Sequence, residues 1–181
     1  MLKLLRDDEV YSEVIERGLR RARHSVWIAT ANVKNLMMSV NENEVESSMD
    51  FFKELASRRV AVRLLHSGVP SGSILHELKA GASPDFSRFF DMRRCVRTHF
   101  KCVLVDSKLL YMGSANFTGA GLGMKGQTRR NFEMGILTDE DGIMDTVADK
   151  FDRIWTGEMC RKCGRKRQCP VPLESPFGRN E

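Results

Sequence analysis

The amino-acid sequence predicts an α/β protein with a mixed, mostly parallel central sheet, helices on both faces of the sheet, and a short cysteine-containing C-terminal tail. Three observations predict this fold. Residues 25–31 are apolar on both faces, as in a strand that helices cover from both sides. A strand–helix–strand order runs from residue 25 to residue 66, which is the unit of a parallel or mixed sheet. A two-strand hairpin follows at residues 100–112.

Hydrophobic periodicity places the elements in chain order. Apolar side chains recur at helical spacing on either side of the first strand, and again at residues 141–155, where acidic residues at the helix start complement its dipole. Gly81 ends the third helix, and residues 106–108 form a tight turn. Residues 113–126 contain five glycines, which predict a loop. The expected elements are helices at 8–22, 47–57, 72–80 and 141–155, and strands at 25–31, 60–66, 89–94, 100–105, 109–112 and 132–137.

Length and composition limit the classes of protein. A chain of 181 residues is long enough for one domain with a sizeable core. The net charge of +5 suits a polyanionic partner, although a basic protein without such a partner has the same composition. No apolar run is long enough to cross a bilayer, and the first residues lack the pattern of a signal peptide. We therefore expect a cytoplasmic protein without a membrane partner.

Polar residues around the predicted hairpin carry the chemistry. His99 and Lys101 are two residues apart, so on a strand they project from the same face. Lys101 supplies a point charge for phosphate, and His99 can act as a nucleophile or an acid–base group near neutral pH. Gly113, Ser114 and Asn116 follow the hairpin and add a hydroxyl, an amide and a close approach of the backbone. These groups suit the surroundings of a phosphoryl oxygen.

This run resembles the H-x-K-x4-D-x6-G-S-x-N signature of the phospholipase D superfamily, and every position matches. Asn131-Phe132-Glu133 resembles the N-x-E that accompanies the signature, and the similarity extends from Val10 to Trp155. The chain looks most like the small single-motif members, which are bacterial endonucleases and the mitochondrial cardiolipin hydrolase type. The resemblance implies a phospholipase D-like catalytic domain at residues 1–157, with a basic cysteine-containing tail at residues 158–181.

The resemblance also implies a two-step mechanism that needs no metal or other cofactor. Its catalytic positions are His99, Lys101, Ser114, Asn116 and Glu133, and its structural positions are Asp106 and Gly113. His99 would form a covalent phosphohistidine while a second histidine protonates the leaving oxygen. Lys101 and Asn116, with help from Ser114, would hold the non-bridging oxygens. Glu133 would hydrogen-bond the His99 ring, and Asp106 would tie the hairpin turn.

The mechanism needs two histidines, and the chain has one in this context, without an internal repeat. The other three, His24, His66 and His76, have no lysine two residues later. His66 ends a predicted strand. It is either a site residue near the rim of the sheet or an ordinary histidine that is buried in the core or exposed to solvent. A two-fold dimer that brings two copies of His99 together is the economical solution, as in the small single-motif relatives.

Three of the five cysteines, Cys160, Cys163 and Cys169, lie in the tail. The C-x2-C spacing suits a structural zinc or iron–sulfur site, with Cys95 or Cys102 as a fourth ligand. The run also resembles part of the iron–sulfur staple in some RecB-type nucleases. Reduced thiols in a basic tail are the alternative.

Basic residues accompany these cysteines and precede Glu133. The candidate nucleic-acid contacts are Arg129, Arg130, Arg161, Lys162, Arg165, Lys166 and Arg167. The sequence thus favours a homodimeric nuclease acting on DNA or RNA, alone or with other subunits of a DNA-processing or defence system. A phospholipid or cardiolipin hydrolase and an inactive nucleic-acid-binding module are the alternatives.

Overall fold

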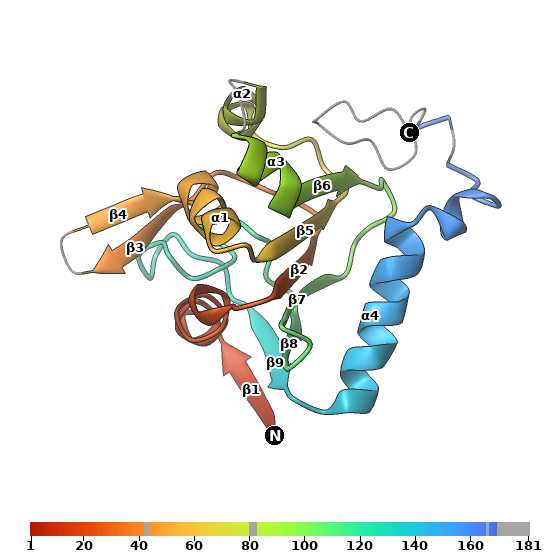
Figure 1. The fold of residues 1–181 in the computed structure, drawn as a ribbon. Helices are drawn as coiled ribbons and strands as arrows, with labels where there is room; N and C mark the ends of the chain where they lie inside the picture. The colour runs from red at the N-terminus through yellow and green to blue at the C-terminus, as the bar shows by residue number, and fades with distance from the viewer. Residues whose placement is uncertain (42–43, 80–82, 166, 170–181) are drawn as a thin grey trace.

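A seven-stranded sheet forms the centre of the molecule (Figure 1). The computed structural model describes residues 1–41, 44–79, 83–165 and 167–169. The strand order in the sheet is β1-β9-β8-β7-β2-β5-β6. These strands are β1 (Leu2–Arg6), β2 (Ser25–Thr30), β5 (Ala61–His66), β6 (Phe90–Arg94), β7 (Lys101–Val105), β8 (Leu109–Gly113) and β9 (Met134–Thr138).

The sheet is mixed, as predicted, but the expectation that it is mostly parallel is wrong. Strand β2 pairs in parallel with β5, and β5 with β6. The other four neighbouring pairs are antiparallel. Helical crossovers join β2 to β5 and β5 to β6, whereas β7, β8 and β9 follow one another through a tight turn and a loop, which permits antiparallel pairing.

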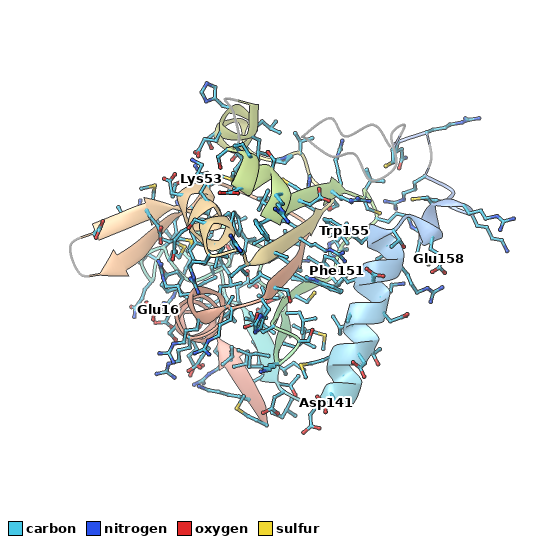
Figure 2. All side chains as sticks on the ribbon, in the orientation of Figure 1. Glu16, Lys53, Asp141, Phe151, Trp155 and Glu158 are labelled. Atoms are coloured by element: carbon cyan, nitrogen blue, oxygen red, sulfur yellow. The ribbon has the colours of Figure 1, made fainter. Side chains whose placement is uncertain are left out.

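Helices cover both faces of the sheet, as predicted (Figure 1). One face carries the larger core, into which α1 (Ser48–Ser57) and α3 (Pro84–Phe89) bury phenylalanines. The other face is covered by α4 (Asp141–Trp155), whose Phe151 and Trp155 point toward the sheet (Figure 2). Phe151 stacks on Trp27 of β2 with ring centroids 5.1 Å apart. The two cores hold the sheet rigidly between the layers.

Local signals explain where the helices begin. The Ser47 side chain caps α1 by accepting a hydrogen bond from the Asp50 N–H at 3.1 Å. Ser83 caps α3 in the same way, and Pro84 occupies the first helical position. Helix α2 spans Gly72–Lys79, so the stop predicted at Gly81 lies outside the described residues.

The segment predicted as one helix at residues 8–22 is helical but irregular. It consists of a π-helix, η1 (Tyr11–Glu16), and a 3-10 turn, η2 (Leu19–Arg21). The Arg17 N–H bonds to the Ser12 carbonyl at 3.1 Å, which widens the helix by one residue. The apolar stripe at helical spacing does not distinguish these helix types.

Several elements of the described residues were not predicted, among them β1, α3, and a hairpin of β3 (Met37–Asn41) and β4 (Glu44–Ser47). Strand β1 lies at the sheet edge, and its exposed Leu2 and Leu4 leave no buried stripe to reveal it. A 3-10 turn, η3 (Glu158–Cys160), follows α4. The domain boundary at residue 157 stays a prediction.

Candidate active site

His99 and Lys101 lie at one end of the central sheet. His99 is exposed and comes immediately before β7, and Lys101 is the first residue of that strand. The Lys101 ammonium donates a hydrogen bond to the His99 carbonyl at 2.8 Å, so it folds back beside the histidine. Cys102 points to the opposite side, into the core beneath α4. The structure thus brings the predicted nucleophile and the predicted phosphate-binding cation together.

The residues after β8 and before β9 meet at the same end of the sheet. Lys101 pairs with Gly113 on β8, and Gly113 pairs with Gly135 on β9. A Cβ atom on Gly113 would lie 2.6 Å from the Met134 carbonyl oxygen and 2.8 Å from the Gly135 Cα. Only glycine therefore permits this close approach of β8 and β9, which supports the structural role predicted for Gly113.

Exposed Ser114 and buried Glu133 form a hydrogen-bonded pair beside this junction. Glu133 is only 6% exposed, and its carboxylate accepts hydrogen bonds from the Ser114 hydroxyl and, at 3.0 Å, from the Asn131 side-chain amide. The backbone N–H of Glu133 donates to the Asp7 carboxylate at 3.0 Å. Sequence reasoning did not single out Asp7, because 126 residues separate it from Glu133.

These contacts differ from the roles that the resemblance predicts. Within the described part of the single chain, the Glu133 carboxylate bonds to Ser114 and Asn131 and makes no hydrogen bond to the His99 ring. The Ser114 hydroxyl donates its hydrogen bond to the Glu133 carboxylate, so it is not directed at a phosphoryl oxygen. The pair instead ties the start of β9 to the end of β8, next to Lys101.

Asn116 is held by its side-chain oxygen at the end of β2. This oxygen accepts hydrogen bonds from the Ala31 N–H at 3.1 Å, the Asn32 N–H at 3.2 Å and the Thr30 hydroxyl at 3.2 Å. The amide NH₂ has no hydrogen-bond partner among the described residues, so it remains available as a donor. Thr30 is buried and also accepts from the Phe117 N–H at 3.0 Å. Thr30 is a positioning residue that sequence reasoning did not assign.

Asp106 lies at the far end of β7 from Lys101. Its carboxylate accepts hydrogen bonds from the backbone N–H groups of Arg23 at 2.9 Å, His24 at 2.7 Å and Ser25 at 2.9 Å. Partial burial acts to raise the pKa of Asp106, but these N–H groups outweigh it and hold the pKa below its ordinary value. The carboxylate fastens the β7–β8 turn to the start of β2, which supports a structural role.

The remaining histidines do not complete the site. His24 lies beside Asp106, roughly 17 Å from Lys101 along the five residues of β7. His66 ends β5 at the same sheet end as Lys101, but it is 2% exposed and its ring bonds to the Gly68 carbonyl at 2.8 Å. His76 is exposed on α2. His66 is therefore a core histidine, one of the two alternatives open from sequence.

The predicted nucleic-acid contacts occupy different surroundings. Arg130 forms an ion pair with Asp8 at 3.1 Å, which neutralises its charge, whereas Arg129 is exposed. The exposed basic residues of the tail are Arg161, Lys162, Arg165 and Arg167. Lys166 lies outside the described residues.

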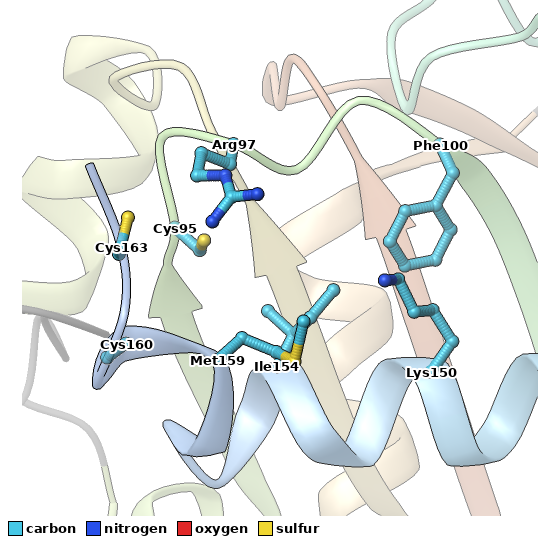
Figure 3. A pocket seen from close by; sticks show the side chains of 8 residues that line it. All are labelled: Cys95, Arg97, Phe100, Lys150, Ile154, Met159, Cys160 and Cys163. Carbon is cyan, nitrogen blue, oxygen red and sulfur yellow. The ribbon is translucent and has the colours of Figure 1, made fainter. Parts of the chain in front are cut away.

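Three of the predicted metal ligands line one cavity of about 120 Å³ between the β6–β7 segment and the residues after α4 (Figure 3). These are Cys95, Cys160 and Cys163. Cys102 is instead 2% exposed beneath α4, where burial raises the pKa of its thiol to about 12. Among the described residues, no three or more histidine, cysteine or acidic side chains are arranged to hold a metal ion. A structural zinc or iron–sulfur site stays a prediction, with Cys95 better placed than Cys102 as the further ligand.

None of the helices within residues 1–41, 44–79, 83–165 and 167–169 has the length and apolarity needed to cross a bilayer.

Solved structures share this fold at low sequence identity. NucT from Helicobacter pylori is 16% identical with a TM-score of 0.58, over 84% of this chain and 94% of that one. Nuc from Salmonella typhimurium, a phospholipase D family member, is 14% identical with a TM-score of 0.54, over 86% of this chain and 94% of that one. TrmBL2, an archaeal chromatin protein with a novel mode of DNA binding, gives the same identity and TM-score over 86% of this chain and 52% of its own.

No curated protein sequence matches this chain significantly. A family model described as cardiolipin synthase, phospholipase D-like domain, matches residues 15–155. This range contains every motif position from His99 to Glu133 and ends with α4. Together with the shared fold, the match confirms the resemblance seen in the sequence: the chain belongs to the phospholipase D-like domain family.

Proposed function

We propose that this protein is a nuclease that hydrolyses phosphodiester bonds of DNA or RNA through a covalent phosphohistidine on His99. The observation that carries the proposal is the arrangement at one end of the sheet. An exposed imidazole, the ammonium group of Lys101 and the unpaired NH₂ group of Asn116 gather there. A nucleophile next to two donors for anionic oxygens is the equipment that phosphoryl transfer requires.

Each step follows from these groups. A ring nitrogen of His99 attacks phosphorus, and a P–N bond forms while the P–O bond to the leaving oxygen breaks. The leaving oxygen takes a proton from a second imidazole. That imidazole then removes a proton from water, whose oxygen attacks phosphorus and breaks the P–N bond. Lys101 and Asn116 stabilise the negative charge on the non-bridging oxygens in both steps. The products are a phosphomonoester and an alcohol, and both imidazoles return to their starting states.

The second imidazole comes from the His99 of a second copy of the chain. His66 is buried and His24 lies at the other end of β7, while His76 is exposed on α2 and has no lysine two residues later. Large apolar side chains are exposed beside the site: Phe132 is 95% exposed and Met134 is 56% exposed. A two-fold interface at this end of the sheet would cover both residues and bring the two His99 rings to one phosphate.

Nucleic acid is the substrate class that the charge of the chain supports. The described part of the tail presents four exposed basic residues, and the net charge is +5. The DNA binding of TrmBL2, which has the same fold, supports this choice. The description of the matching family model as cardiolipin synthase favours a phospholipid substrate as the second candidate.

Cleavage assays with three substrates test the function. Wild type, His99→Ala and the matched control His76→Ala are incubated with single-stranded DNA, single-stranded RNA and cardiolipin vesicles in EDTA. We expect nucleic-acid cleavage by wild type and by His76→Ala, because His76 is an exposed residue of α2 and occupies no position of the motif. We expect His99→Ala to lose at least about 10³-fold in rate, as for the loss of a covalent nucleophile. Cleavage of cardiolipin alone, or binding of DNA without cleavage, would contradict the nuclease assignment.

Light scattering tests the shared site. Phe132→Ser removes an exposed apolar side chain beside Glu133, and Val45→Ser makes the same kind of change on the β3–β4 hairpin, where Val45 is 59% exposed. We expect Phe132→Ser to be a monomer without activity and Val45→Ser to be an active dimer. A fully active monomer of either variant would refute a site built from two subunits.

A further inference from the structure

A basic groove lies beside the candidate active site and is not part of the family motif. It has a volume of about 440 Å³, and Lys34, Lys125 and Arg129 line it together with Met37, Met124 and Gly119. Lys34 precedes the β3–β4 hairpin, and the other two cations belong to the glycine-rich loop after β8. The groove therefore joins two segments that are about ninety residues apart in sequence.

The three cations are available to a ligand. Lys34, Lys125 and Arg129 are all exposed, and none has an ion pair within the part of the chain that the structure describes. No aspartate or glutamate lines the groove. By contrast, Arg130, which follows Arg129 in the chain, forms an ion pair with Asp8. Three unpaired positive charges around one hollow form an anion-binding surface.

Backbone contacts join the groove to the segment that holds Asn116. The Lys34 N–H donates to the Phe117 carbonyl at 3.2 Å, and Val33 and Phe117 form a parallel bridge. Phe117 follows Asn116, whose side-chain oxygen is held by the Asn32 N–H. The two segments that carry the groove cations therefore start from residues that contact each other at Asn116.

We propose that this groove binds the sugar–phosphate backbone of a single strand of nucleic acid next to the phosphate that is cleaved. The inference rests on the proposed function and names the substrate as single-stranded. A hollow of this volume is in the range of pockets that hold one small ligand, which is closer to the size of a few nucleotides of one strand than to that of a duplex. The exposed Met37 and the neighbouring Met124 supply apolar surface for the faces of bases.

Binding measurements with a matched charge control test the groove. The test variant is Lys34→Ser/Lys125→Ser/Arg129→Ser. The control variant is Arg21→Ser/Arg23→Ser/Lys108→Ser, which removes three exposed cations that form no ion pair within the described residues and lie at the Asp106 end of β7. Both carry His99→Ala so that the probe stays intact. Fluorescence anisotropy reports the affinity for a labelled twelve-nucleotide thymidine strand between low and moderate salt.

We expect the test variant to bind the strand about 10- to 100-fold more weakly than the control at low salt. We also expect the magnitude of the slope of log affinity against log salt to be smaller by about 2, because single strands release about 0.7 counterion per neutralised phosphate and three cations are removed. Equal affinities and equal slopes in the two variants would overturn the proposal that the groove binds the strand. So would a preference of the control variant, which keeps the groove, for a twelve-base-pair duplex or for phosphatidylglycerol vesicles over the single strand.

A second readout separates the groove from the chemistry. With His99 intact, the test variant should hydrolyse the small diester bis(p-nitrophenyl) phosphate at the wild-type rate while its KM for single-stranded DNA rises. An equal loss of kcat/KM on the small diester and on single-stranded DNA would contradict the proposal that the groove is a separate binding surface. If wild type cleaves no diester and the binding difference persists, the proposed function fails and the groove stands. If wild type cleaves DNA and the two triple variants bind equally, the groove fails and the function stands.

Discussion

Replacement of Asp106 should destabilise the fold without damaging the chemistry. Its carboxylate accepts three backbone hydrogen bonds, from Arg23, His24 and Ser25, and so fastens the β7–β8 turn to the start of β2. Asp106 also has a φ of 53°, in the left-handed region that aspartate and asparagine tolerate better than alanine. Asp106→Ala therefore loses both the acceptor and the favourable backbone residue, whereas Asp106→Asn keeps the backbone preference and one acceptor oxygen.

The contacts set the size of the effect. The part-buried bond from Ser25 contributes about 1 kcal/mol, and the two exposed bonds contribute about 0.5 kcal/mol each because water can replace the carboxylate there. Left-handed backbone costs alanine about 1 kcal/mol more. We expect the free energy of unfolding to fall by about 3 kcal/mol in Asp106→Ala and by about 1 kcal/mol in Asp106→Asn.

Urea unfolding followed by fluorescence of the two tryptophans measures these differences at one fixed protein concentration. Because the pKa of Asp106 is lowered in the folded state, its contribution is complete above the ordinary carboxyl pKa and is lost as pH falls through the lowered one. The difference in the free energy of unfolding between wild type and Asp106→Asn should thus be constant near neutral pH and become smaller in acid. Under folding conditions kcat should stay within about twofold of wild type, since Lys101 lies roughly 17 Å away. A stable Asp106→Asn protein without activity would refute a structural role.

Three further changes test other parts of the site. Gly113→Ala brings a Cβ atom to 2.6 Å from the Met134 carbonyl oxygen and should cost about 1–3 kcal/mol in urea unfolding; unchanged stability would show that β8 and β9 separate freely. Glu133→Gln weakens the hydrogen bond from the Ser114 hydroxyl. It should lower the free energy of unfolding by about 1–2 kcal/mol and also lower the cleavage rate. Wild-type values for both quantities would contradict the role of the Ser114–Glu133 pair in holding the site. The Cys102 thiol, whose pKa burial raises to about 12, should react with Ellman's reagent at pH 8 only after unfolding; rapid labelling of Cys102 in native protein, located by peptide mapping, would contradict its burial.

The grouping of the candidate site residues at one end of the sheet could be predicted because they are close along the chain, while their catalytic roles stay a prediction. His99, Lys101 and Asn116 surround one hairpin, so strand alternation and turn geometry place them together without knowledge of the rest of the fold. The helix at residues 141–155 was predicted within its observed bounds because its apolar stripe is long and regular.

The unpredicted features depend on contacts that span most of the chain. The Asp7 carboxylate meets the Glu133 backbone across 126 residues, and β1, which carries no buried stripe, pairs with β9. Lys34 joins Lys125 and Arg129 only because the backbone at Lys34 bonds to that of Phe117. Local hydrophobic periodicity does not indicate which distant segments pair. The sequence analysis therefore missed the edge strand β1 and expected more parallel strand pairs than the sheet has.

A covalent adduct measured by mass spectrometry tests the central claim most directly. Wild type is mixed with a single-stranded oligonucleotide, quenched in alkali after one turnover to preserve a P–N bond, and digested for peptide mapping. The account predicts a phosphoryl adduct on the peptide that contains His99, at no more than one adduct per two chains. Cleavage without any adduct, an adduct on another residue, or one adduct on every chain would contradict it.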